Sequence, residues 1–178
     1  MTTVSDEQGK QQMPSYFFDS SAIVKRYHQE PGSLWVRSIC NPRTRPSLYL
    51  AQLAHVEVVA ALRRTGRRED LHPAFVDSLV NLFERHLALS DPARQTPLYR
   101  LIPLSSSVLT LAARLCNRYW DMHPYPMRSL DAIQLAAALL AATAIGDELI
   151  LVTADTRLAA IAPLEGLQVI NPLSPPHP

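Results

Sequence analysis

Short apolar runs recur along this chain, and segments with helical periodicity separate them. Residues 16–18, 48–50 and 149–152 contain apolar side chains without polar alternation. Strands that are covered by helices on both faces have this composition. Strands alternating with helices predict a three-layer α/β/α fold, in which helices cover both faces of a mostly parallel sheet. Ligands of such folds collect beyond the carboxyl ends of the strands, so the residues that follow each strand matter most.

The remaining elements follow from the same patterns. Two further strands are expected at residues 101–104 and 167–170. Helices are expected at residues 21–29, 32–40, 53–64, 73–89, 106–119, 129–144 and 155–161. We expect Gly66 to close the third of these helices, and residues 123–126 to form a loop. A single domain at residues 15–172 is therefore predicted, between a flexible tail at 1–14 and a proline-rich tail at 173–178.

Composition narrows the class of protein. Of 178 residues, 47% are hydrophobic and 19% are charged, which is typical of a globular chain rather than a disordered one. No apolar run is long enough to span a bilayer and no signal-like leader opens the chain, so we expect a soluble, cytoplasmic protein without a membrane partner. The two cysteines lack metal-ligand spacing. Nearly all the positive charge is arginine, which suits phosphate as well as carboxylate partners, although solvated helix ends would explain it equally.

Four acids stand at positions where chemistry is expected. Asp19 and Asp155 each follow a predicted strand and precede a predicted helix, and Asp131 lies in the first turn of an apolar helix. Each of these three could simply cap a helix or complement its dipole, contributing about 1 kcal/mol or less. Glu57 is less easily explained, because its neighbours are almost all apolar and a charged residue is rarely buried unless it is paired. It could still reach solvent or meet an arginine.

Convergence of the four acids would require compensation. Two unit charges about 5 Å apart, at an effective dielectric near 20, repel each other by roughly 3 kcal/mol. The summed repulsion of several such pairs would exceed the stabilisation that helix capping contributes. The cluster would therefore need a bound cation, or protons shared among the acids. Oxygen ligands without a cysteine or histidine set indicate a hard ion, Mg²⁺ or Mn²⁺.

Four ordered stretches around these acids resemble the PIN-domain nucleases, in particular the VapC-type toxins of bacterial toxin–antitoxin pairs. They are FDSSAIVKRY with EPG after it, VEVVAALRR, RSLDAIQLA and VTADTRL, which together span about residues 16–172. One departure is the loop HPYPM at residues 123–127, where the family usually has a short glycine-containing turn.

The resemblance implies a PIN-like fold with a five-stranded sheet and a metal-dependent endoribonuclease that cleaves RNA. It implies that the catalytic and metal-binding residues are Asp19, Glu57, Asp131 and Asp155. Ser21 and Thr153 match small hydroxyl positions that help hold the metal site or its water, and Arg128 matches a frequent basic position before the third acid. The resemblance thus implies that Ser21, Arg128 and Thr153 are substrate-binding residues. Arg26 is a further candidate for neutralising phosphate. The implied partners are an RNA substrate, a cognate antitoxin protein and a second copy of the chain in a homodimer.

Two other classes of protein remain open. An aspartyl-phosphate phosphatase or receiver domain would need a second acid beside Asp19 or a late lysine, and no lysine follows Lys25. A catalytically silent PIN-like module that binds RNA or protein would retain the fold alone. The intact set of acids argues against a silent RNA binder, because such a protein would gain affinity by losing negative charge.

Overall fold

The computed structural model describes residues 14–41, 46–88, 90–91, 96–146 and 148–176. Its helices are α1 Ser20–Ile23, α2 Ser33–Ile39, α3 Ala54–Arg68, α4 Pro73–Ala88, α5 Ser106–Arg118, α6 Ser129–Ile145 and α7 Thr156–Ile161, with short 3-10 segments η1 Val24–Arg26 and η2 Ala162–Glu165. Its strands are β1 Ser15–Phe18, β2 Ser47–Ala51, β3 Ser90–Asp91, β4 Thr96–Pro97, β5 Arg100–Ile102, β6 Leu149–Val152 and β7 Gln168–Ile170. Apart from Pro14, the predicted N-terminal tail lies outside the described residues, as do residues 177–178 of the C-terminal tail.

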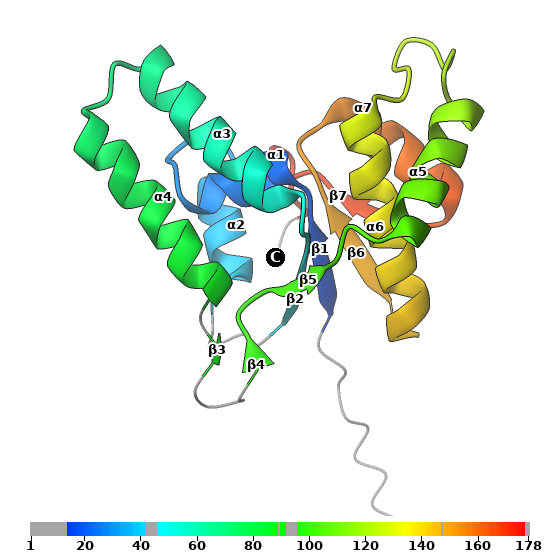
Figure 1. Cartoon of the computed structure of the whole chain (residues 1–178), viewed down its shortest axis with the longest axis horizontal. Helices are drawn as coiled ribbons and strands as arrows, with labels where there is room; N and C mark the ends of the chain where they lie inside the picture. Colours follow the sequence, from blue (N-terminus) through cyan, green and yellow to red (C-terminus); the bar gives the residue numbers. More distant parts are fainter. Residues whose placement is uncertain (1–13, 42–45, 89, 92–95, 147, 177–178) are drawn as a thin grey trace, which may run out of the picture.

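Five strands form one parallel sheet in the order β5-β2-β1-β6-β7. The central strand β1 pairs with β2 on one side and with β6 on the other, so Phe18 lies between Leu50 and Val152. Figure 1 shows the sheet between two groups of helices, with α1 to α4 on one side and α5 to α7 on the other. The predicted three-layer α/β fold is therefore confirmed, with every strand of the main sheet parallel.

Alternate residues of the strands point to opposite faces of the sheet and belong to two separate hydrophobic cores. Phe17, Tyr49 and Leu151 belong to the core beneath α5, α6 and α7, whereas Phe18 and Leu50 belong to the core beneath α1 to α4. Most of these side chains are fully buried, and each contributes about 1.5–3 kcal/mol by leaving water. Helix α6 buries mainly alanine, and these small side chains suit a helix that packs both on the sheet and against α5.

The sequence patterns misplaced some details. The helix predicted at residues 21–29 is one turn of α-helix, α1, continued by η1 and ending at Arg26. Helix α3 does not end at Gly66 but runs through it to Arg68. Gly66 is buried against Val76 of α4, and a Cβ atom there would lie 2.5 Å from Val76 Cγ2. This glycine therefore permits close packing of two helices rather than a helix end. The small antiparallel pair β3–β4 was not expected.

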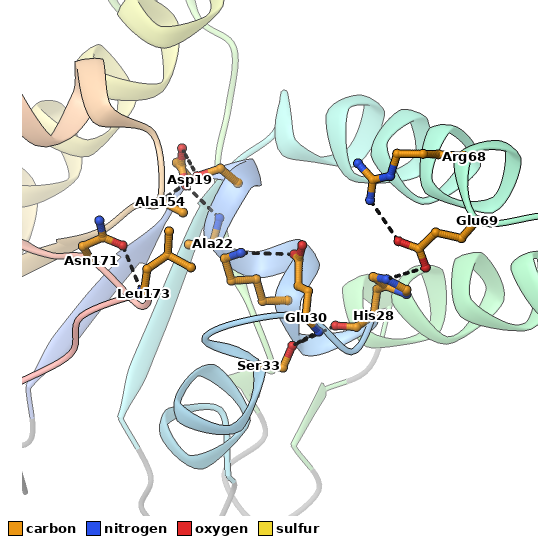
Figure 2. A network of polar contacts seen from close by, with 12 residues as sticks. Asp19, Ala22, His28, Glu30, Ser33, Arg68, Glu69, Ala154, Asn171 and Leu173 are labelled. Carbon is orange, nitrogen blue, oxygen red and sulfur yellow. Dashed lines mark hydrogen bonds and ion pairs between the residues drawn. The ribbon is translucent and has the colours of Figure 1, made fainter.

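The EPG segment at residues 30–32 holds the connection between η1 and α2 in place. Lys25, although buried, forms an ion pair with Glu30 across 3.2 Å. The buried Ser33 hydroxyl accepts a hydrogen bond from the Glu30 amide and donates one to the His28 carbonyl (Figure 2). Gly32 has φ +89°, and a Cβ atom there would approach the Pro172 carbonyl oxygen to 2.6 Å. These residues therefore have a structural role, and they fix the loop between η1 and α2.

Candidate active site

Asp19 stands directly after β1 and caps α1. Its amide continues the sheet by donating to the Val152 carbonyl, and its Oδ1 accepts a hydrogen bond of 2.9 Å from the Ala22 amide. Figure 2 shows the carboxylate beside the start of α1 and close to Ala154. The Ser21 hydroxyl donates to the same carboxylate over 2.8 Å, and Thr153 Oγ1 donates to Oδ2 over 3.0 Å. The strand ending in FDSS thus places a carboxylate at the carboxyl edge of the sheet and fixes both oxygens.

Burial dominates the electrostatics of Asp19. The side chain is 4% exposed, and desolvation raises its pKa to about 7 although the hydrogen bonds from Ser21, Ala22 and Thr153 act in the opposite direction. The negative charge of Asp155 raises the pKa of Asp19 further. A carboxylate that is held rigidly but lacks a compensating positive charge is one that a cation would stabilise.

Asp155 follows β6 and caps α7. Its Oδ1 accepts hydrogen bonds from the amides of Arg157 and Leu158, over 2.7 and 3.1 Å. The loop before Asp155 is held against the start of α1, because Ser21 Oγ accepts a hydrogen bond from the Ala154 amide. Within the loop, Thr153 Oγ1 accepts a hydrogen bond from the Asp155 amide. Ser21 and Thr153 therefore link the two neighbouring strand ends.

Asp131 approaches from the first turn of α6. Desolvation raises its pKa to about 6, and the charges of Asp155 and Glu57 raise it further, whereas Arg157 and Arg128 lower it. One carboxylate oxygen, Oδ2, is buried and has no hydrogen-bond partner among the described residues. A buried carboxylate oxygen without a partner is costly, so this atom favours an incoming cation or donor.

Glu57 in α3 is paired by polar side chains rather than by arginine. Its Oε2 accepts hydrogen bonds from Ser20 Oγ and from Gln134 Nε2, each over 2.5 Å. Gln134 Nε2 also lies 2.9 Å from Ser20 Oγ, so one amide connects α1, α3 and α6. The sequence reasoning missed Ser20 and Gln134. Gln134, 3% exposed, follows Asp131 by three residues on the same helix, and that spacing was an available signal.

Three arginines surround the acids in different ways. Arg128 is exposed, precedes α6 and acts on Asp131 through its charge. Arg157 also acts on Asp131, and its buried Nε donates no hydrogen bond within the described part of the chain. Arg26 instead donates to Tyr99 Oη and lies over the Tyr99 ring at 5.5 Å, so its guanidinium is engaged inside the fold. The expected contact of Arg26 with phosphate is not supported.

A family model described as the PIN domain matches residues 16–164. The chain belongs to the PIN domain family. PIN domains are generally nucleases, and the match spans the candidate acids from Asp19 to Asp155. No protein with curated annotation matches the sequence.

Solved structures share this PIN fold at low sequence identity. One is FitAB bound to an IR36 DNA fragment, with a TM-score of 0.61 and 18% identity over 91% of this chain and 98% of that chain. A second is FitAcB from Neisseria gonorrhoeae, with a TM-score of 0.55 and 18% identity over 88% and 97%. A third is VapBC2 from Rickettsia felis bound to a promoter DNA fragment, with a TM-score of 0.55 and 11% identity over 88% and 97%. At these identities the likeness concerns the fold.

The charge of Asp155 acts on Asp19 and Asp131, and that of Glu57 acts on Asp131, but the described acids form no closed ligand cage. Across the described residues, no three histidine, cysteine, aspartate or glutamate side chains already stand together as a metal-binding group. The donor chemistry nevertheless fits a hard divalent cation, the kind of ion that PIN nucleases typically use. The buried Oδ2 of Asp131 lacks a partner among the described residues, and Asp19 and Asp131 both have raised pKa values that added positive charge would lower.

Among the described residues, no helix is long and apolar enough to cross a membrane.

Proposed function

We propose that this PIN domain is a Mg²⁺- or Mn²⁺-dependent endoribonuclease and the toxin component of a toxin–antitoxin pair. Membership of a nuclease family supports the first part, and the similarity to chains from the FitAB and VapBC2 complexes supports the second. The observation that carries the proposal is the buried, unpartnered Oδ2 of Asp131 beside acids whose charges raise its pKa.

In this proposal all four acids contribute ligands to the ion. Asp19 and Asp131 would hold it directly, and Glu57 and Asp155 would hold it directly or through water. When bound, the ion lowers the pKa of a water molecule and stabilises negative charge on the phosphate. Ser21 and Thr153 keep the Asp19 carboxylate in one orientation, because each donates to it within 3.0 Å.

The positive charge of the exposed Arg128 side chain helps to hold the substrate. Arg128 is exposed beside Asp131, where its guanidinium would bind a backbone phosphate. Water attacks the phosphorus atom and the bond to the 3′ oxygen breaks, so the products carry a 5′-phosphate and a 3′-hydroxyl. Because Arg128 contacts phosphate rather than a base, it contributes affinity and salt dependence, not sequence preference.

The same acids explain the proposed protein partners. An antitoxin segment that presents an arginine would offset their mutual repulsion and block the substrate. We further propose that the chain is a homodimer, as the VapC resemblance implies. Both partners are expected to act in the cytoplasm, where the RNA substrate is found.

The test compares Asp131→Asn with wild type in purified form and in cells. RNA is incubated with each protein and Mn²⁺, and newly formed 5′ ends are sequenced. We expect wild type to produce defined 5′-phosphate ends and Asp131→Asn to lose nearly all of them. The matched control is Asp77→Asn, which removes an exposed carboxylate in the first part of α4 that pairs with Arg63 of α3. Identical ends from wild type and Asp131→Asn would overturn the proposal.

A catalytically silent binding module would behave differently in a metal titration. The proposal predicts that Mn²⁺ binds wild type and that Asp19→Asn and Asp131→Asn each weaken this binding, with Asp77→Asn unchanged. A binding module would show no metal affinity that depends on these acids. Calorimetry on the isolated protein makes this comparison without any substrate.

A further inference from the structure

Buried polar atoms without a partner occur at the candidate active site. Among the described residues, three buried side-chain atoms have no hydrogen-bond partner, namely Asp131 Oδ2, Gln134 Oε1 and Arg157 Nε. The first two are acceptors in the first two turns of α6, where a cation or a donor would satisfy them. Arg157 Nε can only donate, so it needs an acceptor. Native proteins rarely leave such atoms unsatisfied, and the Arg157 donor therefore calls for a partner that the described residues do not supply.

The first turn of α7 holds Arg157 beside the acids. Asp155 caps this helix, and its Oδ1 accepts a hydrogen bond of 2.7 Å from the Arg157 amide. Helix α7 packs against α6, and the charge of Arg157 acts on Asp131 more strongly than the charge of Arg128 does. The Arg157 residue is partly exposed although its Nε is buried. Arg157 is therefore a cation within the acid cluster that keeps some of its atoms open to solvent.

Other arginines of the chain are paired with acids. Arg63 contacts Asp77 over 2.6 Å, and Arg118 contacts Glu165 over 2.7 Å. Arg157 forms no such ion pair within the described part of the chain, although Asp131 lies within reach of its charge. The planar fork of an arginine matches two oxygens of a carboxylate or a phosphate. The Arg157 fork is therefore available to an anion that arrives with the substrate.

We propose that Arg157 binds the scissile phosphate of the RNA substrate. The inference rests on the proposed ribonuclease function and adds a catalytic residue to the four acids. Nε and one terminal nitrogen of the guanidinium would donate to the two non-bridging oxygens of that phosphate. Arg128, which is exposed and precedes α6, would then hold a neighbouring phosphate of the same strand.

The bound guanidinium would stabilise negative charge that develops during hydrolysis. Water adds to the phosphorus atom and gives up one proton, while the bond from phosphorus to the 3′ oxygen breaks and that oxygen gains one proton. Arg157 keeps its own protons throughout, because arginine stays charged in proteins. A donor that is aimed at charge developing in the transition state acts on kcat. Loss of Arg157 should therefore lower kcat, whereas loss of Arg128 should mainly raise KM.

The test measures kcat and KM for cleavage of an RNA strand whose cut bond has been identified by sequencing the new 5′ ends. Arg157→Gln is expected to lose about 100- to 1,000-fold in kcat with little change in KM. Arg157→Lys keeps the charge without the planar fork and should have an intermediate kcat. Arg63→Gln is the matched control and should leave both constants unchanged, since Arg63 pairs with Asp77.

Two measurements separate a phosphate contact from a structural role. Added guanidinium ion should restore part of the cleavage rate of Arg157→Ala, whereas sodium ion at the same concentration should not. Calorimetry without RNA should show that Arg157→Gln binds Mn²⁺ as tightly as wild type or more tightly, because a positive charge near the ion has been removed. Thermal melting shows whether each variant folds, and Arg157→Lys carries the kinetic comparison if Arg157→Gln does not fold.

The outcomes are distinct. Unchanged kcat in a folded Arg157→Gln, or a rise in KM alone, overturns the assignment of Arg157 while wild-type cleavage keeps the proposed function. Weaker Mn²⁺ binding in Arg157→Gln also overturns it, because the arginine then supports the acids rather than the substrate. Failure of wild type to cleave RNA would overturn both proposals.

Discussion

Gln134 Nε2 donates a hydrogen bond of 2.5 Å to Glu57 Oε2, which connects the second turn of the alanine-rich helix α6 to an acid on α3, on the opposite side of the sheet. The contact explains how a glutamate surrounded by apolar residues is tolerated, because the amide and the Ser20 hydroxyl supply donors. It also fixes the direction in which Glu57 points. Gln134 is therefore a positioning residue of the proposed site.

Replacing Gln134 should weaken the site without destroying the fold. Gln134→Met has similar volume but cannot donate, so Glu57 keeps only the Ser20 hydroxyl as partner. Loss of such supporting contacts typically costs about 10- to 100-fold in metal affinity or activity, and we expect a loss in this range. Mn²⁺ titration and RNA cleavage measure it. Unchanged metal affinity and cleavage in a folded Gln134→Met would show that Glu57 needs no support from α6.

Asp19 should destabilise the metal-free protein as the pH rises. Its pKa in the folded chain is about 7, above the ordinary value of 3.8, so between these values the native state holds a proton that the unfolded chain has lost. The free energy of unfolding therefore falls as the pH rises from about 4 to about 7. Asp19→Asn lacks this dependence and should exceed wild type by about 2 kcal/mol or more near pH 8.

Urea unfolding in the presence of a chelator, at several pH values, measures the difference between Asp19→Asn and wild type. The difference should shrink toward zero as the pH approaches about 4, where the unfolded chain is also protonated. Asp77→Asn is again the control, since Asp77 is exposed and paired with Arg63. A less stable Asp19→Asn at every pH would show that the carboxylate acts mainly as a helix cap.

His86 should produce the opposite dependence. Desolvation, followed by the charges of Arg26 and Arg85, lowers its pKa to about 4, below the ordinary value of 6.5. Between these values the unfolded chain binds a proton that the native state does not, so the free energy of unfolding falls as the pH drops from about 6.5 to about 4. His86→Gln retains a side chain that can hydrogen-bond to the Tyr27 hydroxyl, and it should reduce this fall in the free energy of unfolding at acid pH. An unchanged fall in His86→Gln would assign it to other groups.

The sequence predicted where the main strands lie along the chain because each is an apolar run with turn or helix signals beside it. It did not predict their order in the sheet. The same runs located Asp19 and Asp155, since an acid that follows a buried strand must lie at the carboxyl edge of the sheet. Asp131 and Glu57 were placed by their apolar surroundings. Whether the acids hold a metal ion stays a prediction that the metal titration tests.

Other features depend on contacts that local patterns do not contain. A polar residue in an alanine-rich helix has the same local appearance whether it faces solvent or, like Gln134, a distant glutamate. Arg26 resembled a surface cation, yet its partner Tyr99 lies 73 positions away. In each case the deciding neighbour comes from a remote segment, so only the assembled fold shows it.

Gly66 gives a test of helix packing that is independent of the active site. In an exposed helix, alanine would be more stable than glycine by about 1 kcal/mol. Here the new Cβ would lie 2.5 Å from Val76 Cγ2, so Gly66→Ala should instead lower the free energy of unfolding by about 1–3 kcal/mol. Chemical denaturation measures the change. Val76→Ala removes the clashing methyl groups, and the double variant should therefore be more stable than the sum of the two single changes predicts. Additive effects would mean that α3 and α4 do not approach each other closely at this point.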